Sequence, residues 1–219
     1  MEIPTVKLEL YRQDQSEFTR QIKLALENIG VLQVDGLEQR LVDDLYDRMK
    51  KCSKLIFEAG YLGKSFYRYT AGLPSYRFPY KLPGESEKEL VRLISMDVNK
   101  IVDTIYDSSE GSYLKIAYPD PILIGYHKGP KMESLLNRKN MMIKKHADDQ
   151  RLILAAPASA PGLEGLLKNR WIPLQPEPSH LLIWGGIDLK SFSSGRVKPL
   201  VHRVRFPAEE RWALLFAYE

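Results

Sequence analysis

From about residue 110 onwards, short apolar runs alternate with turn residues, and this pattern restricts the possible folds more than any other feature of the sequence. Each run has the length of one strand and is too short for an ordinary helix. Such runs between clusters of turn residues are typical of antiparallel strands, and many in succession predict a sandwich or jelly roll. The predicted strands are residues 112–118, 121–127, 140–147, 151–156, 163–167, 170–174, 180–184, 197–205 and 211–218.

The N-terminal half has helical periodicity instead. Asp14 and Glu17 form a capping-box pattern, in which Asp14 caps a helix and Glu17 reaches back to the Asp14 backbone. Apolar residues then recur on one helical face until Gly30, which ends this predicted helix before a short strand at residues 31–34. Two further amphipathic helices are predicted, with apolar stripes from Leu41 to Ile56 and from Leu90 to Ile105.

Helices followed by many short strands predict an α+β protein, with a helical N-terminal part on a sandwich or jelly roll. No linker divides the chain, so we expect one domain over residues 1–219, mainly helical over 1–110 and a jelly-roll core over 111–219. The composition, 44% apolar and 27% charged, is that of a globular protein and argues against a disordered chain.

Charge, cysteine content and hydropathy exclude several classes of protein. No apolar run approaches the ~18 residues that span a bilayer, and the N-terminus lacks the basic segment and long apolar core of a secretory signal. The single cysteine, Cys52, excludes a disulfide framework and a multi-cysteine zinc site. A net charge of +4 is too small to indicate nucleic-acid binding. We therefore expect a cytoplasmic protein with no membrane partner, and the charge does not favour a nucleic-acid partner.

Three residues in the predicted strands have the chemistry of a metal site. His146 and Asp148 lie two positions apart in one strand, so both side chains point to the same face, and a barrel can bring His202 of the strand 197–205 beside them. Two imidazoles and one carboxylate leave coordination positions open, as in the facial triad of non-haem Fe(II) oxygenases. The alternative is that the three are unrelated surface residues.

Arg211 begins the next predicted strand, after a turn at residues 206–210, and we expect this strand to pair with the strand of His202. A buried arginine is costly unless it meets an anion, and its planar fork suits a carboxylate. A dicarboxylate cosubstrate, held by iron at one end and by Arg211 at the other, would satisfy both groups. The alternative is a surface ion pair of Arg211 with Glu209 or Glu210.

The order His146-x-Asp148, His202, Arg211 resembles that of the 2-oxoglutarate/Fe(II) dioxygenase superfamily, most closely the branch of isopenicillin N synthase and the plant flavonoid and hormone oxygenases. Other segments are similar to family motifs over nearly the whole chain. They are Pro161-Gly-Leu163 with Trp171-Ile-Pro173, Ser193-Ser-Gly-Arg196 with Val201-His-Arg-Val204, and Ala25–Gly30 with Val34-Asp-Gly36.

This resemblance implies a double-stranded β-helix, a jelly roll of the cupin-like kind, with supporting N-terminal helices. It implies Fe(II) on His146, Asp148 and His202, which would be the catalytic centre, with 2-oxoglutarate as cosubstrate and O2 as oxidant. Arg211 would bind the far carboxylate of the cosubstrate, helped by Tyr126 or by Tyr118, and Tyr126 is the better spaced of the two. The implied reaction is hydroxylation or desaturation of a small molecule, coupled to decarboxylation of 2-oxoglutarate to succinate.

Two departures from the family pattern affect this expectation. The usual Arg-x-Ser is here Arg211-Trp-Ala213, so the cosubstrate site at Ala213 lacks a hydroxyl. That keeps open an iron oxidase of the isopenicillin N synthase kind that uses no 2-oxoglutarate, and a non-catalytic metal-binding barrel. The usual NIGD is here Trp184-Gly-Gly-Ile187, so we expect the Trp184 indole to narrow the mouth of the pocket.

The residues that contact the substrate are less constrained by the sequence. The basic stretch 128–145 is either a lid that favours an anionic substrate or a solvated loop, and within it Lys144 shares the face of His146. The aromatic segment 61–81 either packs between helices and barrel or places Tyr67, Arg68 and Tyr69 against the substrate. A hydroxylase of proteins or nucleic acids is a further alternative, although no stacking platform is present.

Overall fold

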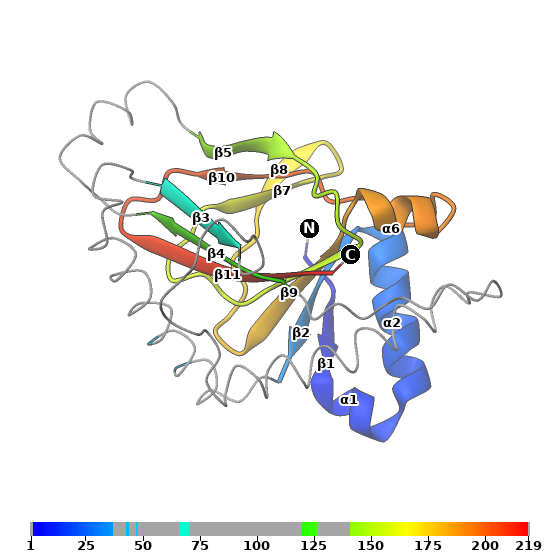
Figure 1. The fold of residues 1–219 in the computed structure, drawn as a ribbon. Helices are drawn as coiled ribbons and strands as arrows, with labels where there is room; N and C mark the ends of the chain where they lie inside the picture. Colours follow the sequence, from blue (N-terminus) through cyan, green and yellow to red (C-terminus); the bar gives the residue numbers. More distant parts are fainter. Residues whose placement is uncertain are drawn as a thin grey trace.

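The computed structural model describes residues 2–36, 43, 47, 66–70, 120–126 and 141–218. Within these residues the chain forms two β-sheets that face one another, with helices at one end (Figure 1). The fold is a jelly roll, as the sequence predicts.

The larger sheet has seven strands in the order β1-β2-β9-β6-β11-β4-β3. Strands β1 and β2 from the N-terminal part of the chain lie at one edge and pair in parallel, whereas the other neighbours are antiparallel. The strands are β1 (Thr5–Lys7), β2 (Val31–Asp35), β3 (Phe66–Thr70), β4 (Asp120–Tyr126), β6 (Leu152–Ala155), β9 (His180–Gly185) and β11 (Arg211–Tyr218).

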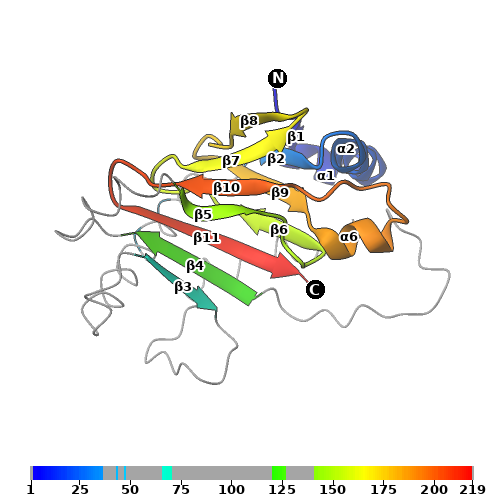
Figure 2. The same cartoon turned by 90° about the horizontal axis from the view of Figure 1, so that it is seen from above.

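The smaller sheet has four antiparallel strands in the order β5-β10-β7-β8. Seen from above, it lies over the side of the larger sheet that holds β2, β9 and β6, and β4 and β3 extend beyond it (Figure 2). Its strands are β5 (Met141–His146), β10 (His202–Arg205), β7 (Leu163–Leu167) and β8 (Arg170–Pro173).

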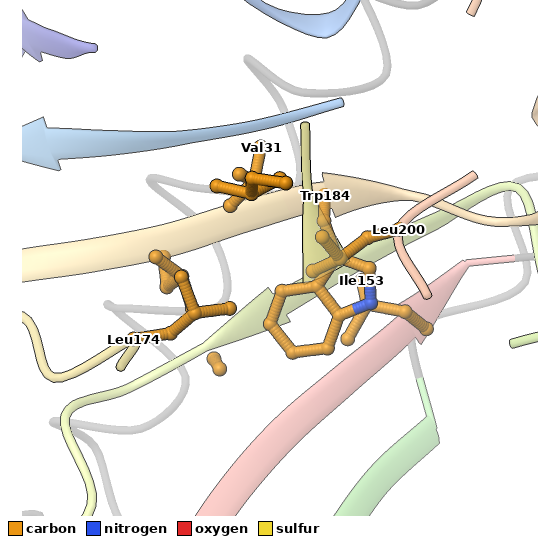
Figure 3. Close-up of a cluster of buried hydrophobic side chains, with 8 residues drawn as sticks. Val31, Ile153, Leu174, Trp184 and Leu200 are labelled. Atoms are coloured by element: carbon orange, nitrogen blue, oxygen red, sulfur yellow. The ribbon is translucent and has the colours of Figure 1, made fainter. Parts of the chain in front are cut away.

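A buried apolar cluster joins the two sheets (Figure 3). Strands of the larger sheet contribute Val31, Ile153 and Trp184, and Leu167 comes from β7 of the smaller one. The cluster is completed by Ala155, Leu174, Leu182 and Leu200. Strands that bury side chains on the inner face of each sheet account for the alternation of apolar runs and turns in the sequence.

Two helices precede β2, namely α1 (Leu8–Gln13) and α2 (Gln15–Asn28). Asp14 caps α2 as predicted, because its carboxylate accepts the Glu17 N–H at 3.0 Å. Glu17 does not reach back to the Asp14 backbone, because α1 already binds the Asp14 N–H through the carbonyl of Leu10 at 2.7 Å. The Glu17 carboxylate instead accepts hydrogen bonds from Arg20 and Gln21.

Most of the strands predicted within the described residues are present, but the boundaries and some elements differ. Only residues 202–205 of the predicted strand 197–205 are extended in a sheet, as β10. Strand β1, helix α1 and the short helix α6 (Ile187–Phe192) were not expected, and β3 lies inside the aromatic segment 61–81. Apart from isolated positions, the predicted helices within 41–56 and 86–105 and the predicted strand 112–118 lie outside the described residues.

None of the helices in the described ranges is long and apolar enough to cross a membrane.

Candidate metal centre

His146 and His202 face each other across two neighbouring strands. His146 ends β5, His202 begins β10, and the two residues are direct partners in the antiparallel register. Their rings lie 4.3 Å apart between centroids. Pairing of distant segments has therefore brought together the two histidines, as the sequence analysis expected.

Asp148 completes the group from the segment that follows β5. Its Oδ1 lies 3.6 Å from His146 Nε2, and its Oδ2 lies 3.6 Å from His202 Nε2. One ligand atom from each of the three residues lies within 4.8 Å of the other two. The three side chains thus form one cluster of metal-ligating atoms.

The expectation that Asp148 shares a strand with His146 is wrong. Strand β5 ends at His146, and the Asp148 carbonyl accepts the N–H of Ile187, the first residue of α6, at 2.8 Å. The chain has left the sheet by this point, so the position of Asp148 follows from its contact with α6 rather than from strand alternation.

Backbone carbonyls fix the orientation of both imidazoles. His146 Nδ1 lies 2.9 Å from the carbonyl oxygen of Lys144, and His202 Nδ1 lies 3.1 Å from that of Leu200. Because a carbonyl only accepts, each Nδ1 carries the hydrogen and each Nε2 presents a lone pair. Histidines that bind a metal through one ring nitrogen usually donate a hydrogen bond from the other ring nitrogen, often to a backbone carbonyl.

The charge states of the cluster also suit a metal. Burial alone would raise the pKa of Asp148, but interactions with the neighbouring His146 and His202 and the hydrogen bond from Trp184 outweigh it and leave this pKa below its ordinary value. Burial lowers the pKa of His202 in spite of attraction to Asp148. A carboxylate and a neutral imidazole at neutral pH are the states that bind metal ions. Two nitrogens and one carboxylate oxygen match the ligand set of non-haem iron.

Trp184 of β9 contacts the cluster directly. Its indole Nε1–H donates to Asp148 Oδ2 at 2.9 Å, and its ring lies 5.5 Å from that of His202. The residue is 0% exposed. The expected position of this indole at the mouth of the pocket is therefore wrong, because it lies buried against the candidate ligands.

A cavity of about 360 Å³ runs between the sheets from the cluster to Arg211. Lys144, Ala213 and Trp184 line it. Most of the remaining wall is apolar and comes from both sheets. These residues are Ile153, Ala155, Ala156, Leu163, Leu174, Leu182, Val204 and Leu215.

Arg211 is buried, with 3% of its surface exposed. Its Nε donates to the carbonyl of Ala160 at 3.0 Å, and no carboxylate of the described residues forms an ion pair with it. Burial lowers the pKa of Arg211 to about 10, so the guanidinium remains charged at neutral pH. The structure therefore does not support the alternative of a surface ion pair with Glu209 or Glu210.

Arg211 begins β11 as predicted, but the predicted pairing of this strand with the strand of His202 is wrong. Strand β11 pairs with β4 and β6, and β10 pairs with β5 and β7. The turn after β10 carries the chain from the smaller sheet to the larger one. Arg211 consequently faces the metal ligands from the opposite sheet, which leaves the cavity between them.

The other predicted binding residues lie on neighbouring strands. Tyr126 is the register partner of Arg211 on β4, and Tyr67, Arg68 and Tyr69 lie on β3, which pairs with β4 at the sheet edge. Tyr118 and residues 128–140 of the basic stretch lie outside the described residues. Sequence reasoning missed Met142 and Gln150, which line the cavity on either side of the His146-x-Asp148 motif, and closeness to that motif was the only available signal.

Residues 112–219 match the family model described as the 2OG-Fe(II) oxygenase superfamily. This segment belongs to the 2OG-Fe(II) oxygenase superfamily. Fe(II) and 2-oxoglutarate, expected from the sequence, are the cofactor and cosubstrate for which that superfamily is named. The match does not specify the isopenicillin N synthase branch, which stays a prediction.

Comparisons with individual proteins agree with this family. Mugineic-acid 3-dioxygenase of Hordeum vulgare is 32% identical over 65 residues, which are 30% of this chain and 19% of that protein. The aligned part is thus about a fifth of the length of this relative.

Solved structures share the fold over nearly the whole chain. A full-length Neurospora crassa protein, solved in complex with alpha-KG, aligns with a TM-score of 0.76 and 13% identity, over 99% of this chain and 84% of that one. The rice dioxygenase for auxin oxidation aligns with a TM-score of 0.71 and 18% identity, over 99% of this chain and 83% of that one.

Proposed function

We propose that this chain is an Fe(II)- and 2-oxoglutarate-dependent oxygenase that acts on a small molecule. One observation carries the proposal: His146, Asp148 and His202 share a single cavity with the buried guanidinium of Arg211. A metal site at one end and a cation at the other suit a ligand that has a metal-chelating group and a distant carboxylate. The superfamily match supports the same reading.

The donor atoms fit ferrous iron. His146 and His202 would each bind through Nε2, and Asp148 would supply a carboxylate oxygen. Three protein ligands leave the other coordination positions to groups that enter the cavity. Bound iron with O2 and 2-oxoglutarate supplies a two-electron oxidation, in which a substrate C–H becomes C–OH while 2-oxoglutarate becomes succinate and CO2.

Arg211 would hold the far carboxylate of 2-oxoglutarate. Burial removes water that would otherwise compete for the guanidinium, and the hydrogen bond from Nε to Ala160 fixes its plane. An unpaired buried charge is costly, so a bound carboxylate would relieve that cost. Tyr126, beside Arg211 in the sheet register, is the proposed helper.

The cavity suggests the kind of substrate. Its largely apolar wall favours a small and mostly apolar molecule. Lys144 is exposed and lines the cavity together with His146, and we propose that it meets an anionic group of that molecule. We propose that Tyr67, Arg68 and Tyr69 of β3 contribute further substrate contacts. Whether the product is hydroxylated or desaturated depends on the substrate, and the cytoplasm remains the expected compartment on the single cysteine of the chain.

Anaerobic visible absorption of the purified protein tests the proposal. Fe(II) is added first and 2-oxoglutarate second, and the signal is the weak charge-transfer band of a keto acid chelated to ferrous iron. We expect the band in the wild type, no band in His202→Ala, and a much higher 2-oxoglutarate requirement in Arg211→Ala. Arg205→Ala is the matched control, because Arg205 is exposed, pairs with Glu164 and does not line the cavity.

The alternatives give different results in the same experiment. An oxidase without a keto acid, which the missing hydroxyl at Ala213 favours, would bind iron and show no band at any 2-oxoglutarate concentration. A non-catalytic barrel would bind metal but form no succinate with any substrate. Iron binding that survives in His202→Ala would contradict the metal site itself.

A further inference from the structure

Trp184 contacts two of the three candidate metal ligands without being a ligand itself. Its indole N–H donates to Asp148 Oδ2, and its ring packs beside His202. An indole N–H only donates a hydrogen bond, and an ionised carboxylate only accepts one. The contact therefore suits the ionised form of Asp148. The side chain is fully buried, which leaves its donor no water to bind instead.

The backbone that follows Trp184 holds the same aspartate. Ile187 N–H donates to the carbonyl of Asp148 at 2.8 Å, and Gly186 N–H donates to that of Arg151 at 3.0 Å. The two segments approach so closely that a Cβ on Gly186 would lie 2.7 Å from the Asp148 carbonyl oxygen. Residues 184–187 thus form hydrogen bonds with Asp148 at two places, its carboxylate and its backbone carbonyl.

The hydrogen bond distinguishes the two carboxylate oxygens. Oδ2 accepts from the Trp184 indole at 2.9 Å and lies 3.6 Å from His202 Nε2, whereas Oδ1 lies 3.6 Å from His146 Nε2 and receives no hydrogen bond from Trp184. The indole therefore fixes the plane of the carboxylate and uses one lone pair of Oδ2, which leaves Oδ1 with both lone pairs for a metal that the two histidines also bind. Partners of this kind that orient a ligand commonly change metal affinity by about 10- to 100-fold when they are removed.

We propose that Trp184 is a positioning residue, which holds Asp148 so that it binds the metal through Oδ1 alone. This inference rests on the proposed metal site and goes beyond it, because it gives a role to a residue that coordinates nothing. It also explains why a fully buried indole directs its polar atom toward the cluster rather than toward a backbone carbonyl.

Metal binding of variants is the first test, with Co(II) titrated by calorimetry into the metal-free protein. Trp184→Phe keeps the aromatic ring and removes the N–H, and we expect its Co(II) affinity to fall about 10- to 100-fold. Trp171→Phe is the matched control, because Trp171 packs under Arg203 on β8 and does not line the cavity. Equal affinities in wild type and Trp184→Phe would overturn the proposal.

Nuclear magnetic resonance of the unaltered protein gives a second readout that does not depend on how well a variant folds. The chain has 3 tryptophans, so the indole Nε1–H groups give few signals, and the two single variants assign those of Trp184 and Trp171. We expect diamagnetic Zn(II) to move the Trp184 signal and to leave that of Trp171 in place. If Trp184→Phe fails to fold, Trp171→Phe and Trp212→Phe assign the other two signals and identify that of Trp184 by elimination.

The outcomes separate this inference from the proposed function. A Trp184 signal that neither Zn(II) nor Asp148→Ala moves, in a protein that binds Zn(II), overturns the positioning role and leaves the metal site standing. If the wild type binds neither Zn(II) nor Co(II), or if His202→Ala binds them equally well, the proposed metal site fails and the positioning role fails with it.

Discussion

Ala213 stands two residues after Arg211 on β11, and both side chains line the cavity. The position is therefore the one from which a hydroxyl could reach a carboxylate held by Arg211. A serine there is the usual residue of the family that the sequence resembles. Ala213→Ser tests at a single atom whether the cavity binds 2-oxoglutarate in the expected way.

We expect Ala213→Ser to bind 2-oxoglutarate more tightly than the wild type. One added hydrogen bond contributes about 0.5–1.5 kcal/mol, or about 2- to 12-fold in Kd. The measurement is titration of the iron-loaded protein with 2-oxoglutarate under anaerobic conditions. Ala213→Cys, similar in size and a weak donor, is the control. Weaker binding in Ala213→Ser would show that a carboxylate does not lie beside this residue.

Arg211 is the second residue at which a single substitution should change the affinity for 2-oxoglutarate. Its charge is buried and its guanidinium is planar, so Arg211→Lys keeps a cation but loses the two-pronged contact with a carboxylate. We expect at least about tenfold weaker 2-oxoglutarate binding, because charge-assisted hydrogen bonds contribute about 1.5–3 kcal/mol each. Calorimetric titration of the metal-saturated protein with 2-oxoglutarate measures this affinity. Unchanged affinity would mean that Arg211 does not contact the cosubstrate.

At the scale of elements, the turn from β9 into α6 contacts the segment that carries Asp148, through the hydrogen bonds of Gly186 and Ile187. Gly186→Ala would place a Cβ against the carbonyl oxygen of Gln150, well inside van der Waals contact, so one segment must move. We expect a loss of about 1–3 kcal/mol in stability together with weaker metal binding, because Asp148 lies on the displaced segment. Thermal unfolding and Co(II) titration measure the two effects.

Gly195→Ala provides the contrast for that prediction. Gly195 has φ +82° but open space around its Cβ position, so alanine there introduces backbone strain of about 1–2 kcal/mol and no clash. We expect this variant to lose stability and to keep its metal affinity. If both glycine variants changed metal affinity equally, the effect of Gly186 would be one of general destabilisation.

Helix α2 gives a pH dependence that is independent of the site. Hydrogen bonds from Arg20 and Gln21 lower the pKa of Glu17 from 4.5 to about 2. A carboxyl group whose pKa is lower in the folded state stabilises the fold above its unfolded pKa, and this contribution is lost as the pH falls toward 2. Glu17→Gln should therefore be less stable than the wild type near pH 6 and equal to it near pH 2.

Chemical unfolding across that pH range measures the difference. Because Glu17 and Arg20 lie at the surface, added salt should reduce it. Lys23→Gln, which removes a charge elsewhere on the same helix, is the control. A difference that grows toward low pH would contradict the assigned contacts.

The positions of the strands along the chain were largely predictable from the sequence, whereas the pairing of the strands was not. Turn residues bound each strand locally, so β7 and β11 match their predicted ranges. Sheet membership depends on contacts between distant segments, and for that reason Arg211 was placed beside His202 instead of opposite it. Helix α6 has six residues, too few for a periodic pattern to reveal it.

The same distinction holds within the site. The ligand residues follow from chemistry and spacing, and the structure brings His146, Asp148 and His202 together. The contact of Trp184 with Asp148 could not be predicted, because it depends on β9 crossing behind the ligands in the opposite sheet. Sequence reasoning thus named the three residues that cluster in the structure, and it named Trp184 as a pocket residue without its contact to Asp148.

At the scale of the whole molecule, the proposed ligands connect the two sheets. His146 and His202 belong to the smaller sheet, and Arg211 belongs to the larger one. A metal alone would stabilise the smaller sheet and the segment of Asp148. A dicarboxylate chelated to that metal would also contact Arg211, and would tie the two sheets together across the cavity.

Thermal unfolding should therefore show that the two ligands act cooperatively. Metal at 100 times its Kd stabilises by about 2.7 kcal/mol, and 2-oxoglutarate should add a comparable amount only when metal is present, because each alone contacts one sheet. Arg211→Ala should keep the increment due to metal and lose that due to 2-oxoglutarate, whereas His202→Ala should lose both. Succinate, which lacks the chelating keto group, is the control ligand and should give less. An equal 2-oxoglutarate increment with and without metal would mean that the two sites are independent, and that the cavity does not hold one ligand between the sheets.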